Sequence, residues 1–189
     1  MGYWGLFIIV MLAGVVIQST LQGKFAKYSK VSLKYGYTGA DIARKMMQDN
    51  GITDVKVECI EGTLTDHYNP STKTVNLSKK VYYGSSVAAA AVAAHECGHV
   101  VQHAVGYAPL KLRSALVPVV SFANNTVQWI LLLGMLMIKT FPTLLWIGIA
   151  LFAMTTLFSF VTLPVEINAS ARAVKWLDNA GITDYETRP

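Results

Sequence analysis

The pattern of apolar and charged positions divides the chain into three long uncharged tracts and one mixed region. No charged side chain occurs in residues 3–21, 114–138 or 140–165. About 20 apolar residues are needed for a helix to cross a bilayer. The pattern therefore predicts three transmembrane helices over these ranges. The second and third form a helical hairpin that turns at "KTFP".

The first tract has two interpretations. A secretory signal carries basic residues, then a short apolar core and a cleavage site of small residues. The first charged side chain here is Lys24, so nothing basic precedes the apolar residues. We therefore expect an uncleaved membrane anchor rather than a cleaved signal.

The second tract contains residues that are costly in lipid: Pro118, Asn124, Asn125 and Gln128. The asparagines can bridge neighbouring helices through hydrogen bonds. Alternatively, they can line a polar cavity beneath an active site. Both interpretations stay open at this point.

The mixed region, 22–113, has the alternating signals of an α+β fold. "TGADIARKMMQDNG" predicts a helix with Thr38 as its cap, and "VKVECI" alternates as a strand. "HYNPSTKTVNLS" predicts a hairpin that turns at "NPST". A further helix is expected over about 86–105, with Ser85 or Ser86 at its start and Gly106 at its end. The fold class is thus α+β, in a multi-pass membrane protein.

Charge indicates how the chain is oriented. Only 14% of the 189 residues are charged, and the net charge is +5. Most basic residues that flank the tracts lie on one side, and they are Lys24, Lys27, Lys30, Lys34, Lys111, Arg113, Arg172 and Lys175; on the other side Lys139 is alone in the hairpin turn. Cytoplasmic loops carry an excess of Lys and Arg. We therefore expect 22–113 and the C-terminal segment in the cytoplasm of a multi-pass cell-membrane protein.

Composition excludes two other classes. We find no nucleic-acid-binding motif and no basic stripe with interleaved aromatic residues, so the positive charge does not indicate nucleic-acid binding. Two cysteines, Cys59 and Cys97, are too few for a disulfide framework. A reducing compartment fits this cysteine content.

The segment "HECGH" carries the candidate chemistry. His95 and His99 are four residues apart, so one helix face presents both imidazoles to a single Zn²⁺ ion. Zinc would lower the pKa of a bound water, and Glu96 would accept its proton as a general base. In the alternative interpretation these are ordinary helix histidines. Cys97 points to the other side of the helix, and we expect it in the core.

Two histidines do not complete a zinc site. His103 lies one further turn along, too far for three successive turns to share one ion. We expect it either near the substrate or in solvent. Glu166 follows the third uncharged tract, so it returns to the side of the membrane where His99 lies. It is the predicted third ligand, carried by a C-terminal helix over 166–189; alternatively, Glu166 only stabilises the start of that helix as an acidic residue.

Nearly the whole chain resembles a bacterial membrane-bound family described as "putative neutral zinc metallopeptidase". The similarity runs through "DHYNPSTKTVNLS", "AVAAHECGHVVQHAVGYAPLKLRSALVPVVSF" and "LPVEINASARAVKWL". It implies a small zincin-like catalytic region over 22–113, one zinc ion per chain on His95 and His99, and catalysis by Glu96. Glu166 and Ala169 also resemble the E-x-x-A-D segment of HtpX-type and CAAX-prenyl-type proteases, whose glutamate is the third ligand.

The chain departs from these relatives in places. Ser170 stands where that segment ends in an acidic residue, and Asn168 stands where the family often has Asp. Asn168, His103 and Arg172 are therefore candidates to contact the ligands or the substrate. Family members tend to continue beyond "GITDYETRP", so we expect a trimmed end.

Three functions compete. The leading one is a zinc metallopeptidase, most simply an endopeptidase, that cleaves peptides or proteins, including membrane proteins, at the cytoplasmic membrane face. A second is an intramembrane, site-2-like zinc protease, although "SSVAAAAVAAHECGHVVQHAVGY" is only weakly hydrophobic. A third is a zinc-stabilised membrane scaffold without activity. Glu96 discriminates among them, because a purely structural site would use four protein ligands and needs no such carboxylate.

Overall fold

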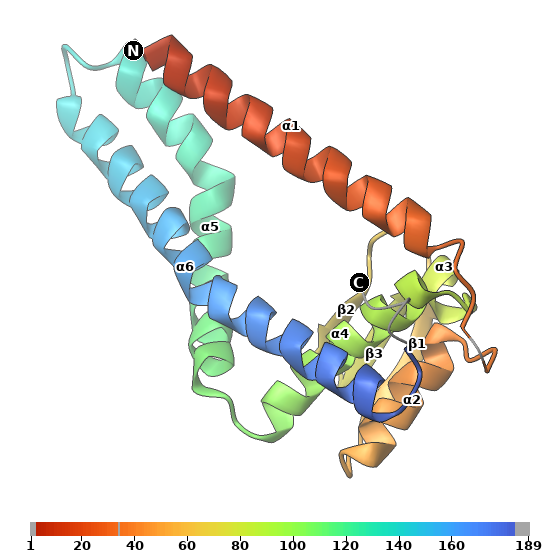
Figure 1. Ribbon diagram of the computed structural model, residues 1–189. Helices are drawn as coiled ribbons and strands as arrows, with labels where there is room; N and C mark the ends of the chain where they lie inside the picture. The colour runs from red at the N-terminus through yellow and green to blue at the C-terminus, as the bar shows by residue number, and fades with distance from the viewer. Residues whose placement is uncertain (1–2, 34, 184–189) are drawn as a thin grey trace. The chain divides into compact units, whose positions relative to one another are not determined.

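The computed structural model describes residues 3–33 and 35–183 (Figure 1). The end at "GITDYETRP" therefore lies mostly outside the described residues, as does Lys34. In chain order the elements are α1 (Tyr3–Tyr28), α2 (Gly39–Asp49), β1 (Lys56–Ile60), β2 (His67–Asn69), β3 (Thr74–Ser78), α3 (Lys79–Tyr82), α4 (Val87–Ala104), α5 (Ala108–Leu136) and α6 (Pro142–Asn179).

The described chain forms two compact units. The first consists of Met1–Cys97 with Arg172–Pro189, and the second of Gly98–Ala171. Helices α4 and α6 each continue from one unit into the other.

A three-stranded sheet of order β1-β3-β2 organises the first unit. The predicted hairpin is confirmed, because β2 and β3 pair antiparallel with Tyr68 opposite Val75. The sequence did not predict that β1 runs parallel to β3. Every residue of the central strand β3 is buried, and α2 packs against β1 and β3.

Helix α2 begins where the sequence predicted. The Thr38 hydroxyl accepts from the Asp41 N–H, and the Asp41 carboxylate accepts from the Thr38 N–H at 3.0 Å, which completes a capping box. The Thr38 hydroxyl also donates to the Asp41 carboxylate at 2.6 Å, and this bond, together with the one from the Thr38 N–H, lowers the pKa of Asp41. Ile42 and Met46 bury the inner face of α2.

Both predicted ends of the HECGH helix, α4, are confirmed. The Ser86 hydroxyl accepts from the Ala89 N–H at its start. At its end Gly106 has φ +66°, and the Tyr107 N–H donates to the Gln102 carbonyl at 2.9 Å, as in a Schellman motif. The left-handed conformation explains why glycine follows the helix.

Helices α5 and α6 are the main elements of the second unit, and the chain turns between them over residues 137–141. The predicted turn at "KTFP" is thus confirmed, with Pro142 opening α6. Gly134 lets the two helices approach closely, since a Cβ there would meet the Leu145 backbone at 2.8 Å. The separate C-terminal helix over 166–189 is wrong, because α6 continues through Pro164 to Asn179.

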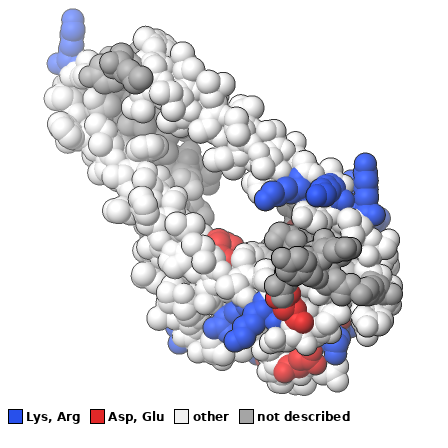
Figure 2. Space-filling model, in the orientation of Figure 1, with Lys and Arg blue, Asp and Glu red and all other residues white. Residues whose placement is uncertain are grey.

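Among the described residues, three helices are long and apolar enough to cross a membrane: α1, α5 and α6. Figure 2 shows long stretches of these helices without charged side chains on the face in view. Their ranges differ from the predicted spans 3–21, 114–138 and 140–165: α1 and α6 end later and α5 begins earlier, because a helix need not end where its side chains cease to be apolar. Asn124 and Asn125 are exposed along α5, so neither interpretation of them is confirmed.

Candidate metal centre

Helix α4 positions both histidines of the HECGH segment. His95 and His99 are one turn apart on a single continuous helix, which fixes their relative placement. Small residues let this part of the helix sink into the protein, and Ala93, Ala94 and Cys97 have no exposed surface. His99 is itself only 8% exposed. A buried histidine of this kind requires polar partners.

One of those partners is Glu166 on α6. His99 Nε2 lies 3.4 Å from Glu166 Oε2. The helices come this close because residue 98 is glycine: a Cβ there would meet the Ala169 carbonyl oxygen at 2.6 Å. Arg113 lies 3.5 Å from the other carboxylate oxygen, Oε1. One oxygen of Glu166 therefore faces the histidine and the other faces a cation.

The donor set fits a zinc ion. The ligand atoms of His95, His99 and Glu166 all lie within 4.8 Å of one another. Zinc binds nitrogen and carboxylate oxygen at about 2.0–2.2 Å, so tetrahedral ligands stand about 3.4 Å apart. The distance of 3.4 Å between His99 and Glu166 matches that separation. Three protein ligands also leave one position open, as catalytic zinc sites do.

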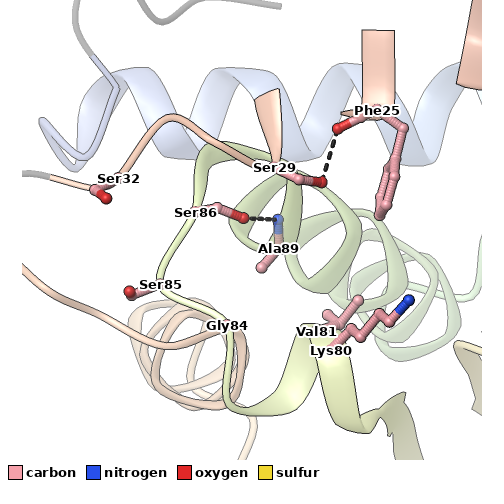
Figure 3. A pocket seen from close by; sticks show the side chains of 9 residues that line it. All are labelled: Phe25, Ser29, Ser32, Lys80, Val81, Gly84, Ser85, Ser86 and Ala89. Atoms are coloured by element: carbon pink, nitrogen blue, oxygen red, sulfur yellow. Dashed lines mark hydrogen bonds between the residues drawn. The ribbon is translucent and has the colours of Figure 1, made fainter. Parts of the chain in front are cut away.

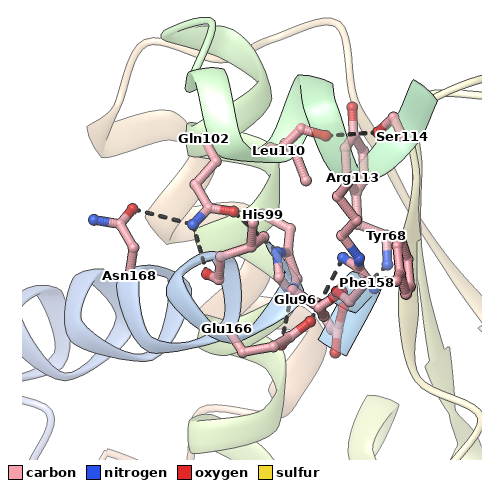
Figure 4. Close-up of polar contacts among 12 residues, drawn as sticks. Tyr68, Glu96, His99, Gln102, Leu110, Arg113, Ser114, Phe158, Glu166 and Asn168 are labelled. Carbon is pink, nitrogen blue, oxygen red and sulfur yellow. Dashed lines mark hydrogen bonds and ion pairs between the residues drawn. The ribbon is translucent and has the colours of Figure 1, made fainter. Parts of the chain in front are cut away.

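Gln102 is a site residue that sequence reasoning missed. Its side chain has no exposed surface. Its Oε1 lies 3.1 Å from Nδ1 of His99, and its Nε2 donates to the Val165 carbonyl at 2.8 Å and to Asn168 Oδ1 at 3.0 Å (Figure 4). One amide thus connects His99 to the helix that carries Glu166. Its position three residues after His99 was the only signal in the sequence.

Glu96 contacts strand β2. Its Oε2 accepts a hydrogen bond from the Tyr68 N–H at 3.0 Å. Because this N–H donates to Glu96 and β2 is an outer strand of the described sheet, the N–H lies on the edge of β2 that faces away from β3. Burial raises the pKa of the Tyr68 phenol, with a smaller effect from Asp54. Tyr68 is therefore neutral at pH 7.

The other predicted residues have different surroundings. Asn168 accepts from Gln102, which places it beside the ligand histidine. His103 is exposed on the last turn of α4 and Arg172 is half-buried, and their proposed roles stay predictions. Burial raises the pKa of Cys97, whose thiol donates to the Ala43 carbonyl at 3.5 Å. A neutral thiol in that contact is a core residue, as expected.

Comparison with known proteins identifies the family of the chain. The family described as "Putative neutral zinc metallopeptidase" matches residues 3–189. The chain is 43% identical over 180 residues to "Putative membrane protease YugP" of Bacillus subtilis (strain 168), and the match covers 93% of this chain and 79% of that protein. No solved structure matches the chain.

Proposed function

The chain belongs to the neutral zinc metallopeptidase family, and from this premise we propose that it is a multi-pass membrane zinc peptidase. His95, His99 and Glu166 would hold the zinc ion, and Glu96 would act as general base. The observation that carries the proposal is the 3.4 Å approach of Glu166 to His99. This approach brings a carboxylate of α6, a helix distant in sequence from α4, to His99, the second histidine of HECGH.

Each side chain has a defined task in this proposal. A bound zinc ion supplies Lewis-acid polarisation of a carbonyl oxygen and a lowered pKa for water. Glu96 accepts the proton of the attacking water and returns it to the leaving amine. Because Glu96 contacts strand β2, its carboxylate lies beside the strand along which a substrate would bind. Gln102 accepts from Nδ1–H of His99, which leaves the Nε2 lone pair for the metal.

The outer edge of β2 is an argument that the substrate is a peptide. An extended chain can add to an open strand edge through main-chain hydrogen bonds. Such a chain would run past the Tyr68 N–H and hence past Glu96, which accepts from that group. An open edge accommodates a chain that continues in both directions, so we propose an endopeptidase.

The candidate membrane helices support a location in the cell membrane, with the catalytic region on the cytoplasmic side. Helices α1, α5 and α6 would span the cell membrane. The basic residues that follow α1 would then lie on the cytoplasmic side. Because two crossings separate His99 from Glu166, both ligands return to that side.

The two alternatives find less support. Helix α4 is not among the described helices that are apolar enough to cross a membrane, which argues against cleavage within the bilayer. A scaffold would need no carboxylate beside the ligand group, whereas Glu96 is held there by the Tyr68 N–H.

The test compares Glu96→Gln with His95→Ala in purified, protease-free protein. Glu96→Gln keeps the side chain's size but cannot accept a proton, so zinc content should stay near one per chain while peptidase activity falls by about 10²–10⁴-fold. His95→Ala should lose zinc and activity together. Full activity in Glu96→Gln would overturn the mechanism.

A further inference from the structure

A partly polar cavity, separate from the candidate metal centre, lies in the first unit where α1 ends. Its volume is about 310 Å³, at the lower end of the roughly 300–1,000 Å³ typical of small-molecule pockets. Figure 3 shows Phe25 of α1 and Ser29, which directly follows α1, on one side, and Lys80 and Val81 of α3 on the other. The cavity is therefore built by the end of a candidate membrane helix and the start of the folded region.

The polar part of the lining offers hydrogen-bond donors and a positive charge. Lys80 makes no ion pair within the described part of the chain, whereas its neighbour Lys79 pairs with Glu61. The Ser86 hydroxyl accepts from the Ala89 N–H, so its own proton is available to donate. Among the described residues, no Asp or Glu lines the cavity. Hydrogen-bond donors and a cation without a neighbouring carboxylate favour an anion.

The charge around the cavity has the same sign. Lys24, Lys27 and Lys30 are exposed on α1 or just beyond it, and no Asp or Glu occurs in residues 1–40. Clusters of basic residues beside a membrane helix attract anionic lipids. The cluster therefore raises the local concentration of the anions that the cavity can accept.

The position of the cavity relative to the apolar span indicates which kind of anion it would bind. The candidate span Trp4–Tyr28 ends at the cavity, whose lining includes Phe25 and Ser29. With α1 in the bilayer, this level is that of the lipid headgroups. Phe25, Val81 and Ala89 supply an apolar side, which suits the glycerol carbons that follow a headgroup phosphate.

We propose that this cavity binds the phosphate of an anionic phospholipid headgroup, with Lys80 as its charged partner. The Ser86 hydroxyl donates to the same phosphate. The proposal rests on the membrane placement of α1 proposed above but not on peptidase activity. A bound lipid would fasten the end of α1 to α3 and to the start of α4, the helix that carries the HECGH segment.

Native mass spectrometry of the full chain in a neutral detergent tests this site, with phosphatidylglycerol as the probe. Phosphatidylglycerol should bind, and Lys80→Gln should weaken that binding about fivefold, the effect of one basic residue near an anionic headgroup. Lys80→Glu should weaken it further. Lys79→Gln is the matched control: it removes the same charge one residue away and should leave binding within about twofold.

Two further probes separate the sources of the phosphate. Phosphatidylcholine, whose headgroup has no net charge, should bind at least about fivefold more weakly, and glycerol 3-phosphate should not compete at the lipid's concentration. Competition by glycerol 3-phosphate at that concentration would overturn the lipid assignment in favour of a soluble phosphate ester. Equal binding by wild type and both Lys80 variants would overturn the site. The zinc content of each variant checks that it is folded. The lipid-binding result does not depend on peptidase activity, so it would stand even if the protein proved to have none.

Discussion

Nδ1 of His99 lies 3.1 Å from Oε1 of Gln102, and this contact sets the tautomer of the imidazole. The orientation of the amide follows from its other end, because the Val165 carbonyl can only accept and so requires the Gln102 NH₂ group. The oxygen must then face His99 and accept from Nδ1–H. Nε2 is thereby left unprotonated on the side of Glu166, where a metal ion would bind.

Replacing Gln102 by Leu should therefore weaken zinc binding without touching a ligand. The substitution removes the acceptor for Nδ1–H and the link to α6. Loss of such a partner typically costs 10–100-fold in metal affinity, and a buried unsatisfied donor costs about 1–3 kcal/mol of unfolding free energy. Competition with a chromophoric chelator measures the affinity. Asn168→Ala is the control: it keeps the bond between Gln102 and His99 and should change the affinity far less. Wild-type affinity in Gln102→Leu would contradict the assigned tautomer.

Gly98→Ala should also lower zinc affinity, because it separates α4 from α6. The added Cβ would meet the Ala169 carbonyl at 2.6 Å, and a backbone atom cannot rotate away as a side chain can. Overpacking of this kind costs about 1–3 kcal/mol, and 1.4 kcal/mol corresponds to a tenfold change in affinity. We expect zinc to bind roughly tenfold more weakly.

A second glycine provides the matched control for that substitution. A Cβ at Gly134 would meet the Leu145 backbone at 2.8 Å, between α5 and α6. Gly134→Ala should destabilise the protein to thermal unfolding by a similar amount but leave zinc affinity unchanged. If both variants lowered the affinity equally, general destabilisation would explain the effect and the specific role of Gly98 would be wrong.

Several elements could be predicted because their signals are local. Thr38 and Asp41 are three residues apart, and Gly106 directly follows the helix it ends, so both caps are visible within one turn of chain. The HECGH spacing likewise indicates two candidate ligands by helix geometry alone. Glu166 needed a different argument, the parity of two membrane crossings, and the structure places it 3.4 Å from His99.

The features that were missed depend on distant segments. The parallel pairing of β1 with β3 has no turn signal, because parallel strands are joined by a crossover. The continuity of α6 was missed because the change from apolar to polar residues near Pro164 marks a change of surroundings and not a helix end. Gln102 looked like any polar helix residue, since its partner carbonyl belongs to Val165.

Two variants test which residue is the third zinc ligand. Glu166→Ala removes the carboxylate that lies 3.4 Å from Nε2 of His99, so zinc content after dialysis should fall from about one per chain toward zero. His103→Ala changes an exposed residue on the last turn of α4 and should keep its zinc. Metal analysis of the two purified variants measures this directly. Zinc retained by Glu166→Ala but lost by His103→Ala would exchange their roles.

The proposed topology can be tested by cysteine labelling in intact cells. Cys59 and Cys97 are the cysteines of this chain, so Cys59→Ser with Cys97→Ala gives a background without thiols. Ser71→Cys introduces a thiol into the exposed loop between β2 and β3, and Thr140→Cys introduces one into the turn between α5 and α6. Ser71 is preferable to Asn69, whose side chain accepts two backbone hydrogen bonds of that loop.

With the catalytic region in the cytoplasm, a membrane-impermeant maleimide should label residue 140 in intact cells. It should label residue 71 only after the cells are opened. The reason is the distribution of basic residues: Lys24 and Lys27 lie near the end of α1 and Lys30 just beyond it, while residues 3–23 carry no charged side chain. Zinc content of the two labelling variants serves as the control for folding. Labelling of residue 71 but not residue 140 in intact cells would show that the orientation is inverted, and would place the proposed peptidase on the outer face while leaving its ligand set unchanged.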